Sequence, residues 1–126
     1  MQFLIRSLLL LMAFVSHMAF ASPVNFEQAT FDALQKEGKP VLVVIHADWC
    51  PTCRAQAPLI SELVATPEFK AVQVMRVDFD ARKDVVKAMK ATMQSTLIVF
   101  KGGREVGRSV GDTRKEGIAA LLKKAL

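Results

Sequence analysis

The sequence predicts an α/β domain in which a mixed central sheet carries helices on both faces. One observation is that short apolar, β-branched segments alternate with segments whose apolar residues recur at helical spacing. Strands that are joined through helices must pair in parallel. The other observation is the Gly102-Gly103 pair between the last two strand-like segments, which indicates a tight antiparallel hairpin. A sheet that contains both kinds of pairing is mixed.

Each element has its own local signal. The strand predictions rest on nearly continuous apolar runs, which are typical of strands covered on both faces. The helix predictions rest on apolar residues three and four positions apart, and the last helix also on a capping box from Thr113 to Glu116. The predicted strands are 41–47, 72–79, 96–100 and 105–110, with a weaker one at 24–26, and the predicted helices are 30–37, 50–65, a segment around 85–89 and a segment after 113–116.

Residues 1–21 have the composition of a signal peptide. Arg6 is their only charged side chain, an apolar run from Leu8 to Val15 follows it, and Ala19-Phe20-Ala21 offers a cleavage site. The alternative is an uncleaved anchor, but the run is shorter than the roughly 20 apolar residues that a spanning helix needs. We therefore expect cleavage after Ala21, export to the periplasm or an equivalent space, and one domain over residues 22–126.

The charge pattern bears on the partners. The formal net charge is +5, and the Lys and Arg residues are scattered rather than gathered in one basic tract. This pattern is typical of a solvated surface. We therefore expect no nucleic-acid partner.

Both cysteines lie in one segment, Cys50-Pro51-Thr52-Cys53. A bridge across so short a loop adds little stability, and a zinc ion needs about four ligands. The pair therefore favours a redox role in an oxidising compartment. A helix that begins at Cys50 places its sulfur among unpaired N–H groups, which stabilise a thiolate. Cys53, one turn later, can release the partner from a mixed disulfide.

The segment from Ala47 to Cys53 resembles the active-site sequence of the thioredoxin family, and the resemblance covers essentially all of residues 22–126. It implies a thioredoxin-like fold and a thiol-disulfide oxidoreductase that acts on protein thiols and disulfides as a monomer, without a cofactor. It also implies that Cys50 is an exposed nucleophile, Cys53 the resolving thiol and Trp49 a flat cover beside them. Pro51 and Thr52 shape the turn. Further matches are Pro58 at the kink of the family's helix, 77–80 in its third strand, 96–103 in its hairpin and Gly111 before its last helix.

Four positions depart from the family pattern, all near the redox centre. Val44 stands in place of a buried aspartate, and Arg76 replaces a lysine, so we expect the Arg76 side chain to reach solvent or another acid. His46 replaces an aromatic residue and is either a packing or surface histidine or a residue that tunes Cys50 through its charge. Ser95 replaces the family's cis-proline. A cis bond before a non-proline residue costs about 2.5 to 4 kcal/mol, so we expect a trans bond after Gln94 and a reshaped loop.

The sequence leaves the direction of electron flow open. We expect a reductant or electron relay, because the chain has no room for the inserted domain of the periplasmic oxidases or the dimerisation domain of the isomerases. A membrane electron donor is the expected source of its electrons. A Cu(I)-binding module is an alternative, with Met93 joining the cysteine pair, although core packing also explains Met75, Met89 and Met93. A non-catalytic partner-binding domain is another. Asp48 is interpreted as a solvated charge.

Overall fold

A five-stranded sheet and four helices make up the computed structural model, which describes residues 22–126. The predicted signal peptide and its cleavage site after Ala21 lie outside the described residues. None of the described helices is long and apolar enough to cross a membrane. The strands are β1 Val24–Asn25, β2 Val41–His46, β3 Gln73–Asp78, β4 Thr96–Lys101 and β5 Arg104–Val110, and the helices are α1 Gln28–Lys36, α2 Pro51–Val64, α3 Lys83–Ala88 and α4 Lys115–Lys123.

The sheet is mixed, as predicted. Its strand order is β1-β3-β2-β4-β5. The strands β1 and β2 run parallel to β3, whereas β4 is antiparallel to both β2 and β5. The ends of the predicted strands and helices differ from the observed ends by at most two residues, and the weak first strand is present as the short β1.

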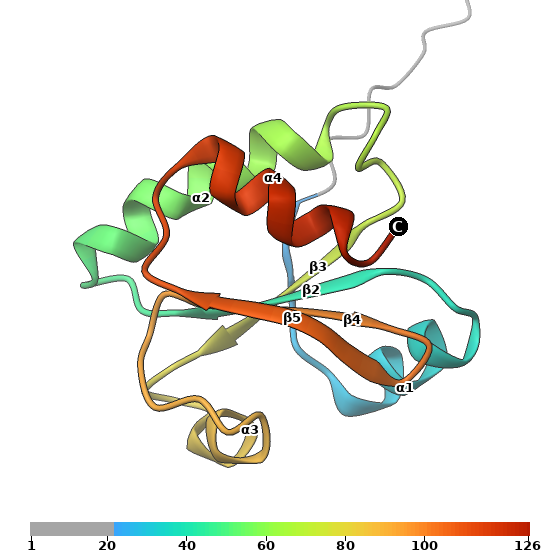
Figure 1. Cartoon of the computed structure of the whole chain (residues 1–126). Helices are drawn as coiled ribbons and strands as arrows, with labels where there is room; N and C mark the ends of the chain where they lie inside the picture. Colours follow the sequence, from blue (N-terminus) through green and yellow to red (C-terminus); the bar gives the residue numbers. More distant parts are fainter. Residues whose placement is uncertain (1–21) are drawn as a thin grey trace, which may run out of the picture.

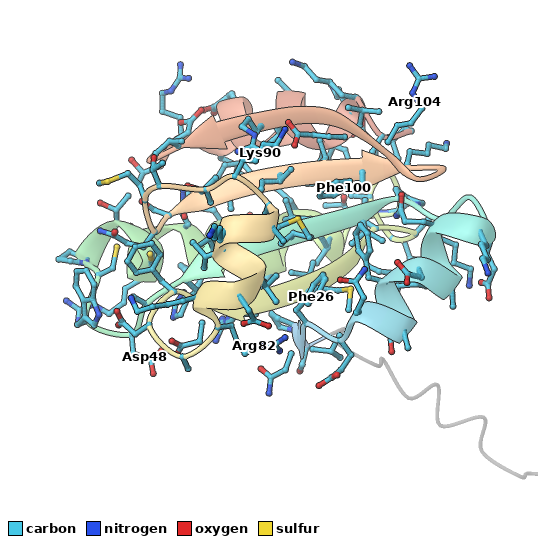
Figure 2. The ribbon with its side chains drawn as sticks, turned by 90° about the horizontal axis from the view of Figure 1, so that it is seen from below. Phe26, Asp48, Arg82, Lys90, Phe100 and Arg104 are labelled. Atoms are coloured by element: carbon cyan, nitrogen blue, oxygen red, sulfur yellow. The ribbon has the colours of Figure 1, made fainter. Side chains whose placement is uncertain are left out.

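Helices cover both faces of the sheet, which confirms the predicted layers. In Figure 1, α2 and α4 lie above the strands, and α1 and α3 lie below them. Figure 2, seen from below, shows α1 and α3 in front of the strands. Successive residues of β2 point to opposite faces: Leu42 and Val44 pack with α2 and α4, whereas Val41, Val43 and Ile45 pack on the side of α1 and α3. This is why β2 is apolar at every position up to Ile45.

The start of α4 differs from the predicted capping box. The N-cap residue is Arg114, and its side chain makes no capping hydrogen bond. The Asp112 carboxylate accepts the backbone N–H of Arg114 at 2.9 Å and is also bonded to its guanidinium. With Arg114 and not Thr113 at the N-cap, the helix begins at Lys115 and the predicted box does not form.

Candidate active site

Cys50 occupies the N-cap position of α2. Its backbone is extended (φ −84°, ψ 114°), and its Sγ accepts a hydrogen bond from the backbone N–H of Cys53 at 3.2 Å. In most helices an oxygen of Ser, Thr, Asp or Asn fills this position, because the first-turn N–H groups have no partner within the helix. Pro51 follows within the first turn, where its missing N–H is not needed. The turn therefore places the Cys50 sulfur at the positive end of α2.

The two sulfurs have opposite protonation preferences, and both cysteines are free thiols. Burial is the largest influence on the pKa of Cys50 and raises it, but hydrogen bonds from Cys53, Gln94 and Thr52 outweigh burial. The pKa of Cys50 therefore lies below its ordinary value of 9.0. Burial, and next the hydrogen bond with Cys50, raise the pKa of Cys53. Cys50 can thus supply the attacking thiolate, whereas Cys53 keeps its proton until it is needed.

The expected exposure of Cys50 is wrong. Cys50 is only 2% exposed and Cys53 only 1%. Ala47 belongs to the same buried cluster, and Phe79 packs against it. Because the capping geometry turns the Cys50 sulfur back over the first turn of α2, most of its surface is covered. A partner must displace part of this cover to reach the sulfur.

Three apolar side chains stay exposed at this end of the sheet: Trp49 at 58%, Met93 at 50% and Val110 at 57%. Trp49 directly precedes Cys50, and its Nε1 donates a hydrogen bond to the Asp80 carboxylate at 2.7 Å, which holds the indole. Met93 lies in the loop before β4 and Val110 ends β5, at the end of the sheet where α2 begins (Figure 1). We call these three residues the apolar rim. Such a surface can be buried by a partner chain.

Ser95 has a left-handed backbone conformation (φ 55°), and no peptide bond within residues 22–126 is cis. The predicted trans bond after Gln94 is therefore confirmed. The Ser95 Oγ donates to the Gln94 carbonyl at 2.6 Å, and the Ser95 carbonyl accepts the N–H of Gly111 at 2.9 Å. The backbone N–H of Ser95, which a proline lacks, opposes the rise in the pKa of Cys53. Ser95 therefore acts on the redox pair through its backbone.

Gln56 is a residue of the site that the sequence analysis missed. It is 1% exposed, and its Nε2 donates to the carbonyls of Ser95 at 3.2 Å and Asp112 at 3.0 Å. One amide thereby ties α2 to the two loops that flank β4 and β5. The available signal was its spacing, since Gln56 shares a helix face with Ile60 and Leu63, which both belong to the core.

His46 lies beside the resolving cysteine. It is 6% exposed, and its Nε2 is 2.9 Å from Oδ1 of Asp48. The Asp48 side chain is 93% exposed, which confirms the prediction of a solvated charge. His46 lines a small cavity together with Cys53. The burial of His46 agrees with the packing alternative.

Arg76 lines the same cavity, and part of its side chain stays exposed, in agreement with the expectation that it reaches solvent or another acid. Its side chain is half-buried. Its Nε is buried without a hydrogen-bond partner in residues 22–126, and no acid pairs with it in that part of the chain. The strand register explains this, because the residue opposite Arg76 on β2 is Val44, which offers no carboxylate.

The arrangement gives little support to a metal centre. Within the described chain, no three His, Cys, Asp or Glu side chains are grouped so that they could hold a metal ion. Met75 and Met89 pack in the core on the side of α1 and α3, as expected from packing. Met93 is half exposed, so the packing interpretation is wrong for that residue. The Cu(I) alternative is not favoured.

Comparisons with known proteins agree with this geometry. The Thioredoxin family model matches residues 22–124. A thioredoxin from Staphylococcus aureus is 36% identical over 103 residues, which are 82% of this chain and 97% of that protein.

Solved structures extend the agreement. The crystal structure of Trxlp from Edwardsiella tarda is 37% identical with a TM-score of 0.77, and the match covers 80% of this chain and 98% of that one. A mutant thioredoxin from Halobacterium salinarum shares the fold, with 22% identity, a TM-score of 0.72 and coverage of 84% and 92%. The chain belongs to the thioredoxin family, and with its Cys50 and Cys53 pair it is a protein-disulfide oxidoreductase.

Proposed function

We propose that this oxidoreductase is an exported reductant or electron relay, which passes electrons from the Cys50 and Cys53 thiols to disulfides of protein partners. The observation that carries the proposal is the asymmetry of the pair. Hydrogen bonds at the N-terminus of α2 lower the pKa of Cys50 despite its burial, whereas burial raises the pKa of Cys53. In such a pair, Cys50 is the thiolate that attacks the partner disulfide, and Cys53 stays protonated until it resolves the mixed disulfide.

The reaction has two exchanges. The Cys50 thiolate attacks one sulfur of the partner disulfide, a Cys50–partner bond forms, and the other partner sulfur leaves as a thiolate. Cys53 then loses its proton and attacks Cys50, which releases the second partner sulfur as a thiolate. The partner has gained two electrons and, with two protons, becomes a dithiol. The protein is left with a Cys50–Cys53 disulfide.

The partner binds over the apolar rim of Trp49, Met93 and Val110. The protein works as a monomer in this proposal. Size-exclusion chromatography with light scattering tests that part.

The proposed export of the protein bears on the proposed direction of electron flow. The signal-peptide composition of residues 1–21 supports an oxidising compartment, where the oxidised pair must be reduced again. A membrane electron donor is the class of partner that can deliver those electrons. Cell fractionation with N-terminal sequencing tests export, and a mature protein that begins at Ser22 in the periplasm is the expected result. Retention in the cytoplasm would overturn it.

The reduction potential of the pair tests the direction. Equilibration with thiol-disulfide buffers should give a value near the about −270 mV of thioredoxin, not near the about −120 mV of the oxidase DsbA. A strongly oxidising value would contradict the proposed reductant.

Trapping identifies the partners. The variant Cys53→Ala should accumulate mixed disulfides through Cys50, because nothing remains to resolve them, and mass spectrometry can identify the attached proteins. The matched variant Cys50→Ala should trap none. Insulin reduction with dithiothreitol is the activity control, and a protein inactive in both assays would be a binding module.

A further inference from the structure

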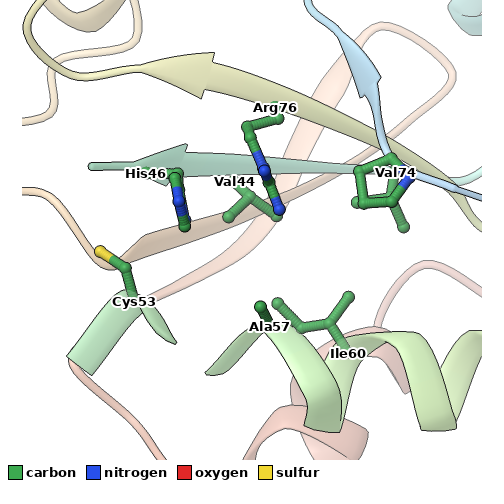
Figure 3. A pocket seen from close by; sticks show the side chains of 8 residues that line it. Val44, His46, Cys53, Ala57, Ile60, Val74 and Arg76 are labelled. Atoms are coloured by element: carbon green, nitrogen blue, oxygen red, sulfur yellow. The ribbon is translucent and has the colours of Figure 1, made fainter. Parts of the chain in front are cut away.

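A small cavity lies between the sheet and α2, directly beside the resolving cysteine. Its volume is about 10 Å³, which is close to the minimum that holds one water molecule. Cys53, His46 and Arg76 supply its polar lining, and the remaining lining residues are apolar. Figure 3 shows the His46 side chain reaching from β2 toward α2, with Cys53 on one side of it and Arg76 on the other.

The strand register brings these groups together. Val44 and Arg76 are direct partners across β2 and β3, and His46 lies two residues after Val44, so all three side chains share one face of the sheet. The first turn of α2 covers that face and contributes Cys53. Among the cavity-lining side chains, His46 is the one whose nitrogen lone pair can accept a proton, because an arginine offers only donors.

Asp48 fixes which nitrogen of His46 can accept a proton. An exposed carboxylate is ionised at neutral pH and only accepts hydrogen bonds. At 2.9 Å from Asp48, the Nε2 of His46 must therefore carry the hydrogen, and Nδ1 keeps its lone pair. The same contact links the buried ring to solvent, since the Asp48 side chain is 93% exposed.

Charged groups of both signs lie around His46. Arg76, from β3, lines the same cavity and carries a permanent positive charge. Asp48 places a carboxylate at Nε2 of His46. Asp78 is in register with His46 on β3, but its Oδ1 accepts the N–H groups of two following residues. On the other side β2 pairs with β4, where Thr96, opposite Ile45, carries no charge.

We infer that His46 accepts the proton of the Cys53 thiol, through one water molecule in this cavity, when Cys53 resolves the mixed disulfide on Cys50. The inference rests on the dithiol-disulfide exchange of the proposed function. Cys53 needs such a group because it is buried, and Val44 leaves the position opposite Arg76 without a carboxylate. His46 acts on the sulfur through the water and does not contact the partner.

The step balances as follows. The S–H bond of Cys53 breaks, and its proton passes to the water while a proton of the water passes to Nδ1 of His46. The Cys53 thiolate attacks the Cys50 sulfur, a Cys50–Cys53 bond forms, and the bond from Cys50 to the partner breaks. The partner sulfur leaves with the electron pair as a thiolate. His46 later returns the extra proton from Nδ1 to solvent, and Nε2 keeps the hydrogen that the Asp48 carboxylate accepts.

Stopped-flow measurement with an aromatic disulfide whose thiol product is coloured, dithiobisnitrobenzoate, separates the two exchanges. With excess reagent and the reduced full chain, the first release of colour reports attack by Cys50, and the second, which is independent of reagent concentration, reports attack by Cys53. In the variant His46→Gln the second release should slow by at least about tenfold at pH 7. The pH profile of the second release should also differ from that of the wild type, because a glutamine side chain cannot accept the proton.

The first release is the internal control. It should change by less than about twofold in His46→Gln, because the hydrogen bonds that lower the pKa of Cys50 come from Cys53, Gln94 and Thr52. A second release with wild-type rate and pH profile overturns the role of His46 and leaves the proposed function standing. Loss of the first release in the wild-type protein overturns the proposed function itself.

A second pair of variants tests whether a carboxylate at position 44 can take over the role of His46. In the His46→Gln background, Val44→Asp should restore most of the second release, because it places a proton acceptor opposite Arg76. The matched Val44→Asn has the same shape without a base and should not. Equal rescue by both would mean that packing, not proton transfer, explains the loss. If His46→Gln does not fold, Asp48→Asn serves instead, and an unchanged second-release pH profile in that variant overturns the inference.

Discussion

Replacing Gln56 by Met tests the tie between α2 and the loops around the redox centre. Met is similar in length and unbranched, so the variant removes the two hydrogen bonds to Ser95 and Asp112 with little loss of packing. Each bond contributes roughly 0.5 to 1.5 kcal/mol net. The Ser95 carbonyl keeps the N–H of Gly111, whereas the Asp112 carbonyl is left without this donor.

One effect works in the opposite direction. Oε1 of Gln56 is buried without a partner in the described part of the chain, and Met removes that unsatisfied group. The net expectation for Gln56→Met is a loss of about 1 to 2 kcal/mol in the free energy of unfolding. For a domain of this size, each kcal/mol lowers Tm by about 4 to 8 °C.

Urea unfolding of the reduced protein, followed by circular dichroism, measures this loss. The matched control is Gln73→Met, because the Gln73 side chain is exposed and, in residues 22–126, makes only a long hydrogen bond, at 3.4 Å, to the carbonyl of Ala71. The control should stay within about 0.5 kcal/mol of the wild type. If Gln56→Met costs no more than the control, the amide does not hold the two loops.

Four further predictions concern the redox pair, the Ser95 loop and one ion pair. Iodoacetamide should label Cys50 before Cys53, and the rate of Cys50 labelling should reach half its maximum below pH 9.0, because the pKa of Cys50 is lowered. Mass spectrometry that finds Cys53 labelled first contradicts this prediction. Ser95→Gly should be more stable than Ser95→Ala by about 1 kcal/mol, because glycine adopts positive φ without a Cβ penalty. Ser95→Pro, whose ring holds φ near −65°, should alter the rate of partner reduction, and unchanged kinetics would make Ser95 a neutral replacement. The hydrogen bond from Arg108 lowers the pKa of Glu105. The stability that this ion pair gives the folded protein is therefore fully present above pH 4.5, the ordinary pKa of Glu, and is lost as the pH falls through the lowered pKa. Glu105→Gln should therefore be less stable than the wild type at pH 7 and equal to it in acid, and a deficit in urea unfolding that persists at low pH would refute the assignment.

The elements and the thiol pair could be predicted because their signals are local. The apolar run from Val41 to Ile45 identifies a covered strand, and apolar residues three and four apart identify the helices. A helix that starts at Cys50 follows from the strand before it and from Pro51. The capping box did not form because α4 begins one residue later than the motif places it, with Arg114 and not Thr113 at the N-cap, and a local motif does not fix the first residue of a helix.

The sequence by itself determined the fold class, the position of the redox pair and the departures at Val44, His46, Arg76 and Ser95. Only the tertiary structure decided how these positions act. It buried Cys50, joined Gln56 to carbonyls 39 and 56 residues away, and placed His46 beside Cys53. The physical reason is that periodicity tells which face a side chain occupies, whereas its neighbours on that face depend on strand register and on where α2 crosses the sheet.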